Sequence, residues 1–334
     1  MSKLNPSISI IVCHHVGDLI YPFVESVKKY CATPYEIIVI SSDAELFTIE
    51  GCRIYFSTEL PAEKRNIGVS LSRSPYIAFF DDDVEITAGC VEQMFRLLLK
   101  PDVGMVFGKL HKYGTKRFDE AGSYLTKTGF LWSRAGQNIH DTGQYDDEIE
   151  ILAGKSASCM IKKTIFNKIG GFDKDFGILG EETDLAWRVW LLGCKVMYCP
   201  SSLAYHKFNT PLKPVNKHYT SERVQFNGCR NYITLLIKNL ETNNLIIPLL
   251  LQFFVWGSAG FSMIMTGKFN QGWNILRGLS YIVTNRKNVM NKRRKVQWLR
   301  VKSDAILLPI ILKRPPRGYY TQRFFKYITS AIHG

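Results

Sequence analysis

This sequence of 334 residues has no CxxC cysteine pair, no low-complexity tract and no visible internal repeat. The eight cysteines are scattered without a CxxC pair, and only Cys194 and Cys199 lie close together. We interpret them as reduced thiols of a cytosolic protein, rather than as a disulfide framework or a zinc site. The N-terminal stretch MSKLNPSISIIVC has a short apolar run and no small-residue cleavage site, so we do not expect a signal peptide.

Acidic residues almost vanish from the last fifth of the chain. From Met1 to Gly267 there are 28 Lys and Arg against 28 Asp and Glu, whereas Lys268 to Gly334 hold 15 basic residues and one acid. The whole formal excess of +14 therefore lies in this tail. A neutral body with a basic tail predicts that the tail binds something anionic, either nucleic acid or a lipid surface.

Charge is missing altogether from residues 242–267. This segment is long enough to cross a bilayer, for which about 20 apolar residues suffice. One span would separate the body from the basic tail, although the positive-inside rule places the tail in the cytosol with the body. Breaks in the helix are also expected, at Pro248, Gln252, Gly257 and Gly260. We therefore predict monotopic attachment, with a broken apolar segment in the inner leaflet; the alternative is a buried helix pair packed on the body.

A second apolar pattern follows within the tail. Its residues have the spacing of one helix face, which predicts a helix lying in the membrane surface: Ile275, Leu276, Leu279, Ile282 and Val283. The stretch NRKNVMNKRRKVQWLR adds seven basic residues in sixteen, and we expect it to lie on anionic headgroups.

Short apolar strands alternate with helices over the first 107 residues. The pattern predicts strands at 7–13, 35–41, 53–57, 76–80 and 103–108, and helices at 18–30, 61–71 and 87–99. Further elements are predicted as a helix at 185–193, a strand at 195–200 and a helix at 221–240. This order predicts a mostly parallel, doubly wound α/β sheet. Residues 108–150 are polar and less periodic, and we expect loops over a site.

Three adjacent aspartates, Asp81, Asp82 and Asp83, follow the predicted strand YIAFF. Ligands bind beyond the carboxyl ends of strands in such sheets. Crowded carboxylates are tolerable when a hard divalent cation such as Mg²⁺ or Mn²⁺ neutralises them. The triplet therefore favours a metal-bridged phosphate substrate, and a solvated acidic turn is the alternative.

A second acidic group, in GEETDLAWR, precedes the predicted helix at 185–193. Asp184 is spaced to pair with Arg188 and to complement the helix dipole, which is a purely structural interpretation. Adjacent Glu181 and Glu182 on a mobile glycine-flanked loop suit a general base.

Two longer segments carry these acids: RNIGVSLSRSPYIAFFDDDV, and LAGKSASCMIKKTIFNKIGGFDKDFGILGEETDLAWRVWLLGCKVMYCPSSLAYH. In this order and spacing they resemble the donor and acceptor segments of family 2 glycosyltransferases of the GT-A fold, especially the bacterial rhamnosyltransferase-like members, over roughly residues 7–240. The resemblance implies a Rossmann-like catalytic domain at 1–219, with a donor half of about 1–107 and an acceptor half of about 108–219. Residues 220–334 then form a helical, membrane-associating region.

The resemblance also implies residue roles. Asp83 matches the direct metal ligand and Glu182 the catalytic base. The resemblance assigns donor binding to Asp43, Arg65, Asp81 and Asp82. It assigns metal binding to Asp83, Asp81 and His206, and catalysis to Glu182, Glu181 or Asp184. A surface histidine is the alternative for His206. The stretch CHHVGD departs from the family's usual turn, and His14 and His15 are candidates for nucleotide contact.

The activity implied is inverting, Mn²⁺- or Mg²⁺-dependent transfer of a hexose or deoxyhexose from a nucleotide diphosphate to a saccharide hydroxyl. With membrane attachment, the expected acceptor is lipid-linked, at the cytoplasmic face of the cell membrane, in polysaccharide or lipopolysaccharide synthesis. The alternatives are a polyprenyl-phosphate glycosyltransferase of the same fold, a basic nucleic-acid-binding protein and a catalytically inactive binding module.

Overall fold

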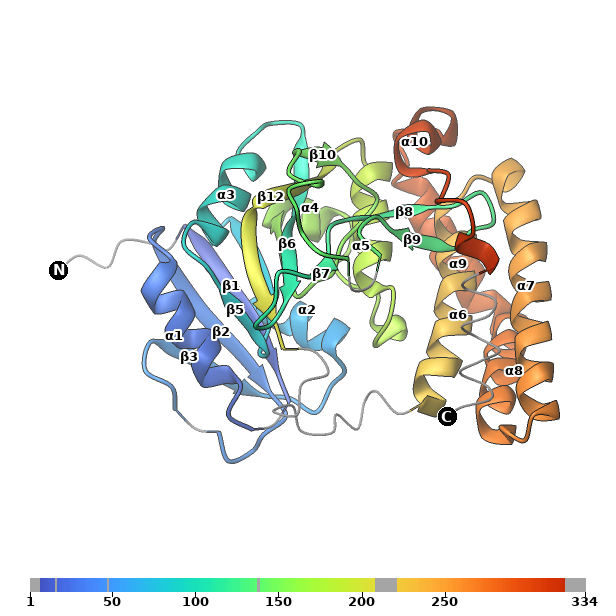
Figure 1. The fold of residues 1–334 in the computed structure, drawn as a ribbon, viewed down its shortest axis with the longest axis horizontal. Helices are drawn as coiled ribbons and strands as arrows, with labels where there is room; N and C mark the ends of the chain where they lie inside the picture. The colour runs from blue at the N-terminus through green and yellow to red at the C-terminus, as the bar shows by residue number, and fades with distance from the viewer. Residues whose placement is uncertain (1–6, 16, 47, 137–138, 208–220, 322–334) are drawn as a thin grey trace.

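The computed structural model describes residues 7–15, 17–46, 48–136, 139–207 and 221–321 (Figure 1). An α/β body carries the sheet, and a group of long helices from the C-terminal third of the chain stands beside it (Figure 1). The body's strands are β1 (Ile8–His14), β2 (Tyr35–Ser41), β3 (Cys52–Phe56), β4 (Tyr76–Asp81), β5 (Val84–Ile86), β6 (Val103–Lys112), β7 (Phe118–Glu120), β8 (Ser123–Leu125), β9 (Leu131–Ser133), β10 (Ile149–Glu150), β11 (Ser158–Lys162) and β12 (Lys195–His206).

The main sheet runs in the order β10–β12–β6–β11–β4–β1–β2–β3, with β5 paired to β12 and β7 to β6. Strands β3, β2, β1 and β4 are parallel, as predicted, and β11 inserts antiparallel between β4 and β6. Apolar runs such as ISIIVC and YIAFF suit these strands because both faces of the sheet are covered. The carboxyl ends of β1, β2 and β4 therefore meet at one edge.

The helices of the body are α1 (Ile20–Tyr30), α2 (Pro61–Leu71), α3 (Cys90–Leu98), α4 (Lys163–Lys168) and α5 (Glu181–Leu191). Helices α1 and α3 bury side chains on one face of the sheet, and α2, α4 and α5 on the other. The predicted bounds of β2 and α2 match those observed. Helix α5 begins at Glu181, four residues earlier than predicted, so its acids lie in the first helical turn rather than ahead of it.

Residues 108–150 differ from the expectation of loops. Strand β6 continues to Lys112, and the short strands β7 to β10 follow. Strands β8 and β9 pair as a separate two-stranded sheet. The hydrophobic positions here are too few per strand to produce a visible alternation, because each of these strands has only two or three residues.

The C-terminal helices are α6 (Ser221–Asn239), α7 (Thr242–Met265), α8 (Phe269–Thr284), α9 (Arg286–Trp298) and α10 (Asp304–Ile311). Helix α7 is continuous, so the prediction of a broken segment at residues 242–267 is wrong. Its glycines allow close packing instead of interrupting it: a Cβ added to Gly272 of α8 would lie 2.5 Å from the carbonyl oxygen of Gly260. Pro248 is accommodated inside the helix and packs near Gly129.

Helix α8 is not a helix lying free in a surface. Ile275 and Ile282, from the predicted membrane face, are buried in a cluster that α6, α7, α8 and α9 share. The spacing that suggests a membrane face is therefore that of an ordinary helix–helix contact. The prediction fails here because a bundle interior and a membrane surface select the same apolar periodicity.

The last described residues return to the body. The tyrosine hydroxyl of Tyr319 donates to the carbonyl oxygen of Leu131 at 2.7 Å, and the backbone N–H of Lys313 donates to the carbonyl of Leu125 at 2.9 Å. A bridge also joins Leu125 to Leu312. The helical region is thus fastened at the β8–β9 hairpin as well as through the packing of α6 on α5.

Candidate active site

Three residues that sequence reasoning groups by motif come together at the carboxyl edge of the sheet. Asp81 ends β4, Asp83 directly precedes β5 in the turn that joins the two strands, and His206 ends β12, which pairs with β5. One ligand atom from each lies within 4.8 Å of the others. Two carboxylates and an imidazole are ligands that a divalent cation accepts, so the residues present fit a metal such as Mn²⁺.

Asp119 orients the histidine of this cluster. His206 Nδ1 lies 2.8 Å from Asp119 Oδ2, and His206 Nε2 lies 3.2 Å from Asp83 Oδ1. Burial alone would lower the pKa of His206, but the hydrogen bonds to Asp119 and Asp83 outweigh it and raise the pKa to about 9. A carboxylate behind a histidine fixes which ring nitrogen faces a metal. Lys155 binds the carboxylate of Asp119 in turn at 2.7 Å.

Sequence reasoning does not identify Asp119 or Lys155. Asp119 lies on β7 in the polar stretch where no motif is visible, and β7 reaches the site only because it pairs with the extended part of β6. Lys155 stands inside the segment LAGKSAS, which the family resemblance covers without giving the lysine a role. Neither local pattern predicts that these residues meet.

Asp82 points to the neighbouring strand. Its Oδ2 lies 2.7 Å from His14 Nδ1 and accepts from the backbone N–H of His15 at 3.3 Å. Lys64, which is buried on α2, donates to the carbonyl oxygen of His14 and to Ser42 Oγ, both at 2.6 Å. The three aspartates thus relieve their mutual repulsion by facing three different partners.

Asp43 lies just beyond β2 at the same edge. Its Oδ1 accepts from the backbone N–H of Glu45 at 3.0 Å, and its own N–H donates to Ser41 Oγ at 2.9 Å. This local turn holds the aspartate beside the ends of β1 and β4, since β1 lies between β2 and β4 in the sheet.

Arg65 connects the two acidic groups. Its guanidinium donates to Asp81 Oδ1 at 2.9 Å and to Glu181 Oε1 at 3.0 Å, and it is almost fully buried. The ring of Phe172 lies 5.5 Å from it. A buried cation between two carboxylates balances their charge and fixes the distance between β4 and α5.

The carboxyl group of Glu182 lies in a different environment from that of Glu181. Burial and the negative charge of Glu181 raise the pKa of Glu182 well above its ordinary value. Its side chain is partly exposed, whereas that of Glu181 is buried against Arg65. A carboxyl group with a raised pKa at the edge of a site has the properties of a general base or acid.

Asp184 does not share that environment. Arg188 donates to its Oδ2 at 2.9 Å, while Lys238 and Asn239 of α6 lie 2.9 and 3.1 Å from its Oδ1. Burial would raise the pKa of Asp184, but Arg188 and Lys238 hold it below its ordinary value. Its contacts are those of the structural pair expected at this spacing, extended to join α5 to α6.

The comparisons with known proteins agree with this geometry. Residues 9–170, just under half of the chain, match the model of glycosyl transferase family 2. Pre-mycofactocin glycosyltransferases of two Mycobacterium tuberculosis strains are 27% identical over 159 residues, which cover 46% of this chain and 31% of theirs. The match thus spans about a third of the length of these curated relatives.

Solved structures share the fold over most of the chain. GalNAc-T7, determined with UDP, GalNAc and Mn²⁺, aligns with a TM-score of 0.57 and 12% identity, over 91% of this chain and 57% of that one. S. aureus TarS 1–349 aligns with a TM-score of 0.50 and 13% identity, over 87% of this chain and 90% of that one. The α/β body therefore has the GT-A fold, and residues 9–170 within it match glycosyl transferase family 2.

Proposed function

We propose that the chain is an inverting glycosyltransferase that moves a hexose or deoxyhexose from a nucleotide diphosphate to an acceptor hydroxyl. The observation that carries this proposal is the meeting of Asp81, Asp83 and His206 at the sheet edge, joined through Arg65 to the first turn of α5. We place the chain among the rhamnosyltransferase-like members of the family on its sequence motifs alone. Residues 1–219 form the catalytic domain in this proposal.

The donor half binds the nucleotide sugar through the ends of β1, β2 and β4. In this proposal Asp43 contacts the base, Asp81 lies nearer the ribose with Asp82 as a further donor-binding residue, and Asp83, Asp81 and His206 hold the divalent cation. When bound, that cation stabilises the negative charge of the departing diphosphate. Arg65 contributes by holding Asp81 in place, since its guanidinium is already committed to Asp81 and Glu181.

Glu182 is the proposed base. Its raised pKa suits acceptance of a proton from the attacking hydroxyl at near-neutral pH. The neighbouring negative charge of Glu181, which Arg65 contacts at 3.0 Å, helps to raise this pKa. Asp184 is too fully engaged with Arg188, Lys238 and Asn239 to exchange protons with an acceptor.

Helix α7 supports membrane attachment of residues 220–334. It is long and apolar enough to cross a membrane by length and composition, and only 22% of its most apolar window is buried. One face packs on α8 and the body, through Gln252, Trp256 and Met263 among others. Beyond the first turn of α7, its exposed side chains are nevertheless apolar apart from Ser258: Ile246, Ile247, Leu250, Phe254, Val255, Phe261 and Met265.

We propose that this exposed face, together with Phe269 and Trp273 of α8, lies in the inner leaflet at the cytoplasmic surface. A helix that is held along its whole length by its own bundle lies flat on a bilayer rather than crossing it. The basic residues of the tail then meet anionic headgroups, each for about 1 kcal/mol. Attachment of this kind favours a lipid-linked saccharide acceptor in cell-surface polysaccharide or lipopolysaccharide synthesis.

The decisive experiment screens the purified full chain against a panel of nucleotide sugars, with and without Mn²⁺, by donor hydrolysis and by thermal shift. Stabilisation by one nucleotide sugar that requires Mn²⁺ is the expected result. No response to any donor would overturn the proposal. A second arm offers the productive donor both a soluble saccharide and a polyprenyl phosphate, and faster transfer to the phosphate would favour the alternative reaction. Stabilisation by nucleic acid instead of any donor would favour the binding-protein alternative.

A further inference from the structure

The turn that leads into α5 has an unusual backbone. Gly177, Leu179 and Gly180 have φ angles of 64°, 72° and 85°, in the left-handed region. Within the described ranges, Leu179 is the one residue other than glycine with a positive φ. A side chain is held in this conformation only where its surroundings impose it, and such positions gather at functional sites. The strained turn ends one residue before Glu181.

Asn231 of α6 imposes this conformation. Its Nδ2 lies 2.9 Å from the carbonyl oxygens of Phe176 and Ile178 and 2.8 Å from that of Leu179. Arg230 Nε donates to Asn231 Oδ1 at 2.9 Å, so the amide is oriented with its two hydrogens toward the three carbonyls. The side chain is only 2% exposed, so water does not replace these bonds when they are lost.

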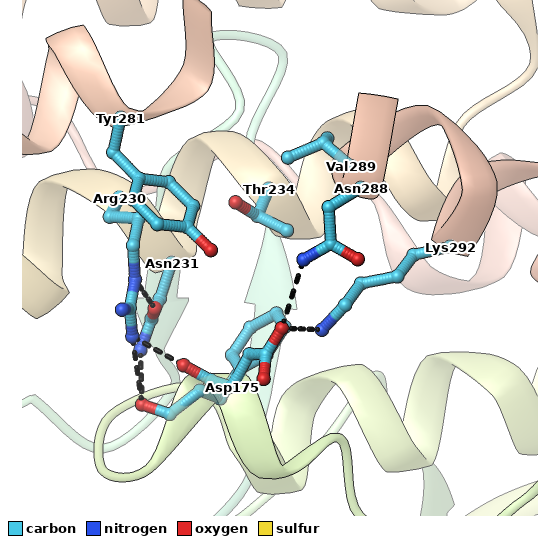
Figure 2. A pocket seen from close by; sticks show the side chains of 9 residues that line it. Asp175, Arg230, Asn231, Thr234, Tyr281, Asn288, Val289 and Lys292 are labelled. Carbon is cyan, nitrogen blue, oxygen red and sulfur yellow. Dashed lines mark hydrogen bonds and ion pairs between the residues drawn. The ribbon is translucent and has the colours of Figure 1, made fainter. Parts of the chain in front are cut away.

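Arg230 extends the contact. Its guanidinium donates to the carbonyl oxygens of Asp175 and Phe176 at 2.5 and 3.3 Å, and it lies over the ring of Tyr281 (Figure 2). It also lies over the ring of Phe226. On the far side of the same turn, Lys292 of α9 lies 2.6 Å from Asp175 Oδ2 (Figure 2).

The space between these groups is small. Figure 2 shows the side chains of α6, α8 and α9 gathered over the turn, and the cavity that they leave is about 10 Å³. That volume holds one water at most. The polar groups therefore serve the turn itself rather than a ligand.

We propose that Asn231 is a positioning residue for the reaction: by holding the carbonyls of Phe176, Ile178 and Leu179, it fixes where α5 begins and hence where Glu182 stands. This inference rests on the proposed function only for the role of Glu182 as base. It makes the C-terminal helices part of the catalytic unit, in addition to any role at a membrane. Loosening the turn leaves the metal residues in place, because Asp81 ends β4, Asp83 directly precedes β5 and His206 ends β12.

Amide hydrogen exchange of the full chain tests the structural step without any substrate. Asn231→Asp keeps the size of the side chain and removes both donors, and Asn231→Ser keeps one donor in case the first variant does not fold. We expect exchange of the amides of residues 176–184 to accelerate at least tenfold, with peptides of β1 and α3 unchanged. Asn243→Asp, at an exposed position of α7, is the matched control. Exchange that is unchanged in 176–184, or accelerated equally everywhere, would overturn the proposal.

Kinetics test the catalytic step with the nucleotide sugar that the donor panel identifies. The Asn231→Ser variant should lose ten- to a hundredfold in kcat while KM for the donor stays within about twofold. A loose turn combined with unchanged kcat would refute the positioning role. Absence of any transfer by the wild type would count against the proposed function, and the exchange result would still decide whether Asn231 holds the turn.

Discussion

The α/β body and the C-terminal helices differ in their balance of acidic and basic residues. Up to Gly267 the chain has equal numbers of acids and bases, and the body pairs its buried charges internally, as Arg65 does with Asp81 and Glu181. Beyond Gly267 there are 15 basic residues and one acid. The acids that some of these bases contact, such as Asp173 and Asp175, belong to the body.

The difference separates two kinds of surface. The candidate active site of the body lies at the carboxyl edge of the sheet, where the nucleotide sugar is proposed to bind. Within the described residues, α7 presents exposed apolar side chains, and the sequence after Gly267 has far more bases than acids. Changes to the body should therefore alter turnover without altering attachment, and changes to α7 or α9 should do the reverse.

The largest expected effect is that of Asp83→Asn. Removing one carboxylate from the cluster of Asp81, Asp83 and His206 should abolish transfer and Mn²⁺-dependent donor binding, while vesicle binding stays at the wild-type level. Transfer assays, donor thermal shifts and sedimentation with vesicles measure the three properties. Asp102→Asn, a matched change at an exposed position of the body, is the control. Near wild-type transfer by a folded Asp83→Asn variant would disprove the metal assignment.

Glu182→Gln should lower kcat by roughly two to four orders of magnitude, the usual contribution of a general base. Donor affinity should hardly change, because the base acts on the acceptor. In the wild type, the raised pKa of Glu182 means that the carboxyl becomes protonated, and inactive as a base, while the pH is still well above the ordinary value of 4.5. The acid limb of the kcat profile should therefore lie well above pH 4.5 in the wild type. Glu59→Gln is the control, and collapse of donor binding would instead assign Glu182 to the donor site.

For the C-terminal helices, Leu250→Glu with Phe254→Glu should weaken vesicle binding by roughly two to four orders of magnitude. Each apolar side chain that leaves the bilayer costs about 1.5–3 kcal/mol. Transfer to a soluble saccharide should be unaffected. The same change at Leu99 and Phe56, which are exposed on the body, is the control and should not affect vesicle binding. Equal losses in both pairs would refute α7 as the attachment face.

Neutralising Arg294 and Lys295 to Gln should have a smaller effect. Two exposed charges at about 1 kcal/mol each correspond to about thirtyfold in affinity for anionic vesicles, and to none for zwitterionic ones. The difference should shrink as salt is added. Lys29→Gln with Lys116→Gln on the body is the matched control. Losses that are the same on both kinds of vesicle would point to damage to the bundle.

The smallest expected effect concerns Leu179, in the turn where the body contacts α6. It distinguishes backbone strain at this residue from the packing of its side chain. Leu179→Gly should be more stable than Leu179→Ala by about 1 kcal/mol, the reverse of the usual order, because glycine adopts φ of 72° without strain. Urea unfolding of both variants measures the difference. The usual order, with alanine more stable, would show that residue 179 bears no strain.

The sequence predicts most of the body because local patterns suffice there. Strand β2 and helix α2 have the predicted bounds, since an apolar run and Pro61 at a helix start are local signals. The acids of the site are found because the motif places them at strand and helix ends. Asp119 and Asn231 are missed because each acts on residues far away in the chain, through pairing and packing that no local pattern records. The continuity of α7 is missed because Gly260 and Pro248 are judged without their neighbours.

The fastening of Tyr319 and Lys313 to the β8–β9 hairpin has a geometric consequence. A helical region held to the body at two places keeps a fixed orientation relative to the body. If α7 lies on the bilayer, this fixed orientation sets the height and tilt of the sheet edge above the lipid. Only an acceptor whose reactive hydroxyl projects to that height would meet Glu182. The two attachments would therefore select saccharides by their length.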